Sequence, residues 1–283
     1  MMAIINGYAT LTDYKNNKDI QSSNVDDDSV IEQLIEGASR FIDEKTAKTF
    51  YPRIQTRYQS VPEYGLEDAD ELWLDDSLLE VITITNGNGV VVSANDYYSK
   101  PRNDYPKYAI CLKDSATIGW VSDAAGNDDY VIAVNALWGF HDQYQVRGWT
   151  VATAVNKIGG ITATESPITV DQGLNIQPGK IVRIDNEIMI CKASDATNLI
   201  PIARGDNGST AATHLDDAPV YVWTPMPTIR MACLEIVKSA YSRRFGTNTT
   251  GTAMITGAGV VITPEEVPAF AWNIINTYKP DVP

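Results

Sequence analysis

Residues 26–50 read DDDSVIEQLIEGASRFIDEKTAKTF, and their apolar side chains recur at steps of three and four residues. The apolar stripe consists of Ile31, Leu34, Ile35, Ala38, Phe41 and Ile42. This period is typical of an amphipathic helix that buries one face. Acidic residues 26–28 suit the positive end of a helix dipole, and Ser29 followed by Glu32 fits a capping box. The Tyr51-Pro52 dipeptide predicts that the helix ends before it.

A second helical pattern occupies PTIRMACLEIVKSAYSRRF at residues 227–245, and Gly246 follows Arg243 and Arg244 as a stop signal. Its apolar face consists of Ile229, Cys233, Ile236, Val237, Ala240 and Tyr241. We expect the helices at 27–49 and 228–245 to pack together as the core of a helical bundle. The predicted packing residues are Ile31, Leu34, Ile35, Phe41, Ile229, Cys233, Ile236 and Tyr241.

Short runs rich in Val, Ile, Thr and Tyr lie between these helices and predict strands. Residues 79–85 and 89–92, joined by Asn86-Gly87-Asn88, favour a hairpin. Another strand is expected at 130–134. A second β-rich stretch covers residues 147–223, where frequent turn signals favour a small barrel or sandwich.

The sequence therefore predicts an α+β fold: a helical bundle core with an embedded β-strand region and an inserted small β-barrel or sandwich domain. The predicted divisions are 1–50 for the N-terminal helical part, 51–146 for the β-strand region, 147–223 for the inserted β domain, 224–246 for the C-terminal core helix, and 247–283 for a flexible linker with a docking segment.

The linker, TNTTGTAMITGAGVVIT at residues 247–263, is uncharged and rich in Gly and Thr. Thr263, Pro264 and Glu266 fit the start of a short terminal helix. Its predicted docking residues are Pro264, Val267, Phe270, Trp272, Ile275 and Tyr278. An aromatic helix on a tether is suited to gripping a neighbouring protein, and it is equally suited to packing on its own core.

Composition restricts the function. The chain has 22 Lys and Arg against 36 Asp and Glu, a net charge of −14, which argues against tight nucleic-acid binding. Three widely spaced cysteines predict neither a disulfide framework nor a zinc site. No stretch is long and apolar enough to be a signal peptide or to span a bilayer.

We find no motif that predicts catalysis. The two histidines, His141 and His214, lie beside no nucleophile motif, and Gly257-Ala258-Gly259 lacks the lysine of a phosphate-binding loop. Acidic clusters at 26–28, 75–76 and 128–129 are better explained as solvated turns than as a metal site or a hydrolase pair. Residues 205–208, Gly-Asp-Asn-Gly, are typical of a tight turn. We therefore expect no enzyme activity, cofactor or metal.

Several segments, in their order along the chain, resemble the head-to-tail connector (adaptor) proteins of tailed bacteriophages. They are DDDSVIEQLIEGASRFIDEKTAKTFYPR (26–53), LWLDDSLLEVITIT (72–85), ANDYYSKPRNDYP (94–106), VNALWGFHD (134–142) and PTIRMACLEIVKSAYSRR (227–244). Residues 179–223 also resemble a small β-module found in phage structural proteins. An insert of this kind departs from the compact pattern of the family.

This resemblance implies a structural virion protein that forms a ring, typically a dodecamer, under the portal. The ring would offer a platform for the stopper or tail protein, with genomic DNA passing through without specific binding. It implies that the bundle forms the ring and that residues 264–278 reach the portal protein. Assembly would occur in the cytoplasm of the host bacterium, and the mature location would be the virion neck. The alternative is a phage tail or surface-binding module that uses the β-rich insert.

Overall fold

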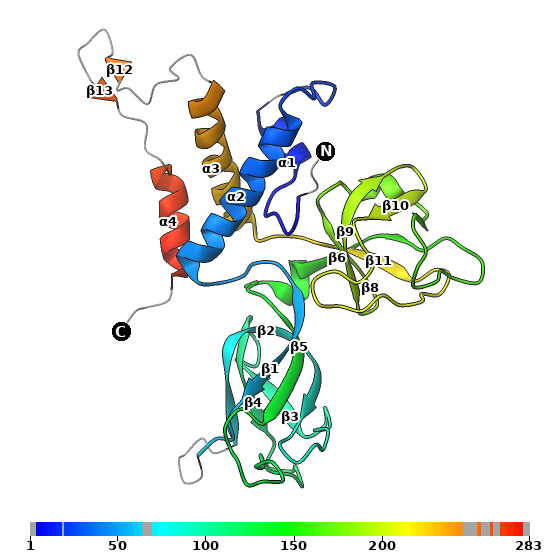
Figure 1. Cartoon of the computed structure of the whole chain (residues 1–283). Coiled ribbons are helices and arrows are strands. Elements are labelled where there is room, and N and C mark those ends of the chain that lie inside the picture. The colour runs from blue at the N-terminus through cyan, green and yellow to red at the C-terminus, as the bar shows by residue number, and fades with distance from the viewer. Residues whose placement is uncertain are drawn as a thin grey trace. The chain divides into compact units, whose positions relative to one another are not determined.

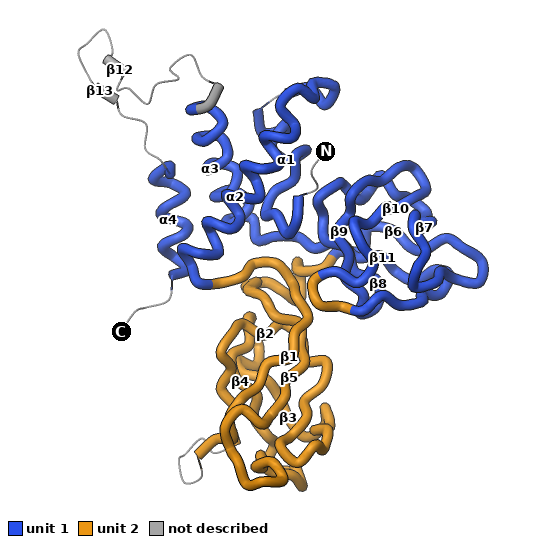
Figure 2. Tube along the Cα trace, viewed as in Figure 1, with its two compact units in different colours: residues 1–47, 150–206, 210–283 blue, residues 48–149, 207–209 orange. Residues whose placement is uncertain are grey.

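The computed structural model describes residues 4–18, 20–63, 70–245, 254–255, 261–262 and 267–279. The chain divides into two compact units, which Figure 2 shows in different colours. The first unit comprises residues 1–47, 150–206 and 210–283, and the second comprises residues 48–149 and 207–209. The first unit therefore groups most of the second β-rich stretch with the helices. No described helix is both long and apolar enough to cross a membrane.

The predicted fold class is wrong. The described chain is mostly β, with antiparallel sheets of five and six strands and four helices of at least seven residues, so its core is not a helical bundle. The physical reason for the β-rich fold is that many apolar side chains are buried against the sheets, because each sheet has a hydrophobic cluster of its own. The strong helical periodicity of two segments led us to overestimate the share of the core that helices supply.

The helices of the first unit are α1 (Leu11–Asn17), α2 (Asp28–Thr46), α3 (Pro227–Phe245) and α4 (Ala269–Tyr278), shown in Figure 1. The helix predicted from residues 26–50 is confirmed as α2, which ends at the left-handed residue Ala47. Its predicted capping box is wrong, because Asp27 is the N-cap and its side chain accepts no hydrogen bond from the first backbone N–H groups of the helix. A capping box forms instead at α1, between Thr10 and Asp13.

The first unit also contains a six-stranded antiparallel sheet in the order β6-β11-β8-β9-β10-β7. The strands are β6 (Trp149–Ala154), β7 (Ile168–Thr169), β8 (Ile181–Ile184), β9 (Glu187–Ser194), β10 (Asn198–Pro201) and β11 (Pro219–Trp223). An antiparallel bridge between Val155 and Val170 joins the ends of the two outer strands. This bridge closes the sheet into a small barrel around a buried cluster of apolar side chains. A 3-10 turn at Gly173–Asn175 interrupts the connection after β7.

The second unit is a five-stranded antiparallel sheet in the order β1-β5-β2-β4-β3. Its strands are β1 (Arg53–Gln59), β2 (Glu71–Thr85), β3 (Tyr97–Lys100), β4 (Lys107–Leu112) and β5 (Ile132–Trp138), followed by a π-helical turn at Tyr144–Gly148. The predicted hairpin after β2 is reduced to one bridge, Thr85 to Val91, because the chain turns away after Val92.

Most of the predicted linker lies outside the described residues. Within it, β12 (Met254–Ile255) pairs antiparallel with β13 (Val261–Ile262).

Candidate assembly surface

The helix cluster, by which we mean α1, α2, α3 and α4, brings together helices from the N-terminal and the C-terminal parts of the chain. Ile31 and Ile35 of α2, and Ile229 and Cys233 of α3, are at most 2% exposed. The Cys233 Sγ atom lies 3.7 Å from the Ser39 Oγ atom and 3.9 Å from the Ile35 carbonyl oxygen. This close approach of a small thiol and a small hydroxyl lets α2 and α3 pack tightly along their buried faces.

Polar contacts fix the N-terminal end of α2 against its neighbours. The Tyr241 hydroxyl of α3 donates to the Asp27 carboxylate at 2.6 Å, and this bond raises the pKa of Tyr241 to about 12. Lys15 of α1 and Asp28 of α2 form an ion pair of 2.6 Å in which both side chains are buried. These contacts join α1, α2 and α3 at one end of the helix cluster.

The terminal helix α4 packs on the chain's own α2 and α3, as Figure 1 shows. The Trp272 and Phe41 rings meet edge to face with centroids 5.7 Å apart, and the Lys279 ammonium lies 5.2 Å from the Trp272 centroid. The hydroxyl groups of Tyr278 and Thr228 are 3.1 Å apart. The chain itself therefore provides a binding surface for α4.

The predicted docking residues consequently divide into two groups. Ile275 is fully buried, while Val267, Trp272 and Tyr278 are partly buried. Phe270 is 49% exposed, which leaves an aromatic ring of α4 in contact with solvent. Pro264 lies outside the described residues.

The predicted packing residues lie largely as their pattern suggests. Ile31, Ile35, Ile229, Cys233 and Ile236 are buried, whereas Leu34, Phe41 and Tyr241 are partly buried. Their partners include α1 and α4, which sequence periodicity did not indicate. Thiol chemistry is suppressed here, because complete burial raises the pKa of Cys233 to about 12.

His214 is part of a buried polar network in the β-barrel. Glu187 receives two bonds from Arg204, at 2.7 and 2.8 Å, and its Oε2 atom lies 2.8 Å from His214 Nε2. The other ring nitrogen of His214 lies 2.7 Å from Asp185. Arg204 also donates to the carbonyl oxygens of Thr162, Glu165 and Ala212. Because these groups bond one another, the network fastens the loop between β10 and β11 rather than exposing a reactive group.

The loop itself contains the tight turn predicted at residues 205–208. Gly205, Asn207 and Gly208 all have positive φ values, so that prediction is confirmed. The Glu187 network was missed, since its members lie 17 and 27 residues apart along the chain and no local pattern links them.

The acidic pairs of the second unit are held in structural contacts. Asp76 accepts from Arg53 at 2.8 Å and from Arg57 at 2.7 Å, and Asp75 pairs with Arg57 at 3.0 Å. The carboxylate of Asp128 accepts from the Ser122 hydroxyl in a turn. Within the described ranges, no group of three or more His, Cys, Asp or Glu side chains is arranged to hold a metal ion.

Comparison with known proteins adds no relative to this description. No model of a protein family matches the chain, and no curated protein matches its sequence.

Proposed function

We propose that this chain is a structural subunit of the head-to-tail connector of a tailed bacteriophage, forming a ring between the portal and the stopper or tail. One observation carries the proposal: two segments with the connector-like pattern, separated by most of the chain, pack on each other as α2 and α3. The contact between Ser39 and Cys233 joins residues 194 positions apart. Such closure gives the subunit a fixed helical edge from which a repeating contact can be built.

The exposed part of α4 supplies the second element of the proposal. Trp272 and Ile275 hold the helix on its own subunit, which leaves Phe270 to contact the portal protein. A half-exposed aromatic ring on a well-packed helix suits this role, because little side-chain entropy is lost when it binds.

The charge balance fits the passage of DNA. A net charge of −14 opposes adhesion of the phosphate backbone, so DNA would move through a ring of such subunits without being held.

A complementation experiment tests the proposal. Phage lacking the gene for this chain would be supplied with the full chain, with a chain lacking residues 263–283, or with the Phe270→Ala variant. The proposal expects the full chain to restore infectious particles and the deletion to yield filled heads without tails. The milder variant should reduce the yield. Full rescue by the deletion would contradict a role for this segment in head completion.

A second candidate function is a tail or surface-binding module that uses the β-barrel. It is favoured by two exposed apolar side chains on neighbouring loops, Ile158 at 97% and Leu215 at 79%. The loops are joined by a hydrogen bond from the Lys157 backbone N–H to Asp216, at 2.7 Å, and by the bridge between Ile161 and His214. If this candidate is correct, Ile158→Asp abolishes adsorption of particles to cells, whereas the connector role predicts normal adsorption.

A further inference from the structure

A cavity of about 230 Å³ lies within the first unit, between residues of the N-terminal segment, α1 and α2 on one side and strand β9 with the turn before β8 on the other. It is lined by Ile4, Leu11, Thr12, Glu32, Pro178, Gly179, Cys191, Lys192 and Ala193. Most of these residues present aliphatic or other apolar atoms. For comparison, a dry cavity of about 150 Å³ is enough to bind benzene. The space therefore suits a small organic group.

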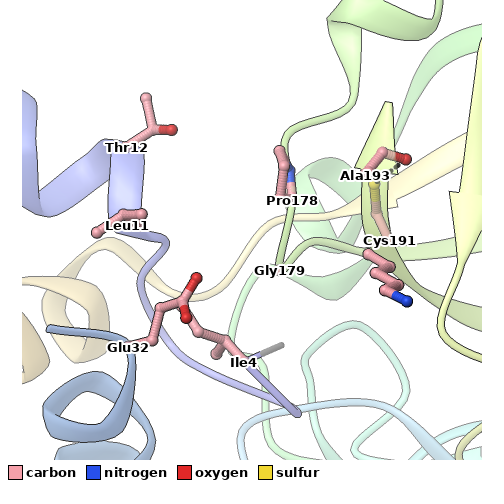
Figure 3. A pocket seen from close by; sticks show the side chains of 9 residues that line it. Ile4, Leu11, Thr12, Glu32, Pro178, Gly179, Cys191 and Ala193 are labelled. Carbon is pink, nitrogen blue, oxygen red and sulfur yellow. Dashed lines mark hydrogen bonds between the residues drawn. The ribbon is translucent and has the colours of Figure 1, made fainter. Parts of the chain in front are cut away.

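Glu32 is the unusual member of the lining. Glu32 is 6% exposed, and its Oε2 atom has no hydrogen-bond partner among the described residues. Figure 3 shows its carboxylate pointing into the space between Leu11 and Thr12 on one side and Pro178 and Gly179 on the other. A buried carboxylate oxygen without a hydrogen-bond partner is costly, so this atom marks where a ligand donor would be most favourable.

A cation suits this carboxylate oxygen better than a neutral donor, because a hydrogen bond to a charged partner is the stronger one. Burial raises the pKa of Glu32 and the nearby Asp28 carboxylate raises it further, while the positive charges of the N-terminal amine and of Lys15 act in the opposite direction. Lys15 itself is already paired with Asp28 and with the Asn24 carbonyl oxygen. The other cationic residue of the lining, Lys192, is exposed. A ligand that brings its own positive charge would compensate Glu32 directly.

We propose that this cavity binds an alkylammonium group, whose charged head pairs with the Glu32 carboxylate and whose short aliphatic body contacts Ile4, Leu11 and Ala193. This inference is independent of the connector role. Two sources supply such a group: a free aliphatic amine, or a lysine side chain from a second copy of the chain.

The test uses the full chain and n-butylammonium as the probe, at mildly alkaline pH, with binding followed by NMR shifts. We expect saturable binding with shifts concentrated at residues that line the cavity. Butanol, a neutral probe of the same size, should bind at least about tenfold more weakly, since a hydrogen bond to a buried charge is worth about 1.5–3 kcal/mol. Equal binding of the two probes, or no saturable binding, would overturn the proposal.

Three variants sharpen the test. Glu32→Gln keeps the shape and should weaken n-butylammonium binding at least about tenfold, whereas Glu36→Gln, one turn further along α2, should leave binding unchanged. Ala193→Leu should fill the cavity while retaining the Glu32 carboxylate. This variant should also lose n-butylammonium binding, and it keeps the test available if Glu32→Gln folds poorly. Retained binding in both Glu32→Gln and Ala193→Leu would contradict the assignment.

Sedimentation distinguishes the two sources. If a lysine of a second copy fills the cavity, Glu32→Gln weakens self-association of the chain. If the source is a free amine, self-association is the same for the variant and the parent while amine binding is lost. Either result, together with saturable binding of the probe, supports the alkylammonium site.

Discussion

The Sγ atom of Cys233 lies 3.7 Å from the Oγ atom of Ser39, although the two residues are 194 positions apart in the sequence. The Ser39 hydroxyl also donates to the Ile35 carbonyl oxygen at 2.7 Å and accepts from the Tyr8 backbone N–H at 3.0 Å. One small polar group thus links the N-terminal segment, α2 and α3. The connector proposal depends on this contact between α2 and α3.

The buried face of α2 should not tolerate charge. Ile35→Asp places a carboxylate at a fully buried position, and we expect it to lower the free energy of unfolding by about 3–5 kcal/mol. Gln33→Asp, at an exposed position of the same helix, is the control. Denaturant unfolding measures both variants. A soluble, native Ile35→Asp protein with the stability of the control would contradict the packing described for α2.

Docking of α4 can be tested through the Phe41 and Trp272 rings. In a double-mutant cycle of Phe41→Ala and Trp272→Ala, we expect a coupling of about 0.5–1.5 kcal/mol. The matched cycle of Phe41→Ala with Phe270→Ala should be additive, because Phe270 is half-exposed. Additivity in both cycles would show that α4 does not rest on α2.

The β-barrel should be most stable in mildly acidic solution. Burial alone would raise the pKa of Glu187, but bonds from Arg204, His214 and the Ala212 backbone N–H outweigh it and lower the pKa from 4.5 to about 2. For His214, burial lowers the pKa, yet its bonds to Glu187 and Asp185 raise it above 6.5. Stability from Glu187 is therefore present above pH 4.5 and lost as pH falls toward about 2. Stability from His214 is present below pH 6.5 and lost as pH rises through its folded-state pKa.

Hydrogen exchange of β8 and β9 amides measures this window. Between about pH 4.5 and 6.5 both contributions are present, so protection should be greatest there. Glu187→Gln should destabilise the barrel by about 3–5 kcal/mol, because it leaves Arg204 and His214 without their buried anion. Asp171→Asn, at an exposed position, is the control. A Glu187→Gln barrel as well protected as the control would refute the structural role of the network.

The two neighbouring acids of β2 should differ in effect. Asp76 is 15% exposed in its side chain and binds two arginines, whereas Asp75 is 57% exposed. Asp76→Ala should destabilise the second unit by about 2 kcal/mol more than Asp75→Ala does. The Asp75→Ala variant itself should lose only about 0–1 kcal/mol, as is usual for an ion pair at the surface. Thermal unfolding compares the two variants.

The exposed acidic residues should also be dispensable for function. Asp75→Ala and Asp128→Ala should leave particle assembly intact. Loss of assembly in either variant would instead support a catalytic role for these carboxylates.

Local patterns predicted individual elements better than their assembly. The apolar steps from Ile31 to Ile42 located α2 to within a few residues, because helical burial has a short-range signature. Strands β6 and β10 fall within the predicted β-rich stretch but were not predicted individually. They are short, and β6 carries exposed residues such as Val151, which weaken an alternating pattern. Closure of the barrel depends on a single bridge between Val155 and Val170, which has no local signal.

In the candidate sites, too, the sequence predicted local structure better than tertiary contacts. Glu32 fits a solvated position of a capping box when only the sequence is considered. It is buried because residues of α1 and β9, distant in the sequence, line the same cavity. Likewise, the sequence left open whether the helix of Trp272 grips a neighbouring protein or packs on its own core, and in the structure the Trp272 ring meets Phe41 of the same chain. Tertiary contacts of this kind override intrinsic preference, so a sequence reading cannot supply them.

Electron microscopy of purified virions from the phage that encodes this chain tests the central claim most directly. Particles would be imaged with the neck reconstructed, and the chain would be located by a small tag at its N-terminus. The connector proposal predicts a closed ring of this chain beneath the portal, with α4 on the side facing the portal. A virion neck that lacks the chain, or a chain found elsewhere on the particle, would contradict it.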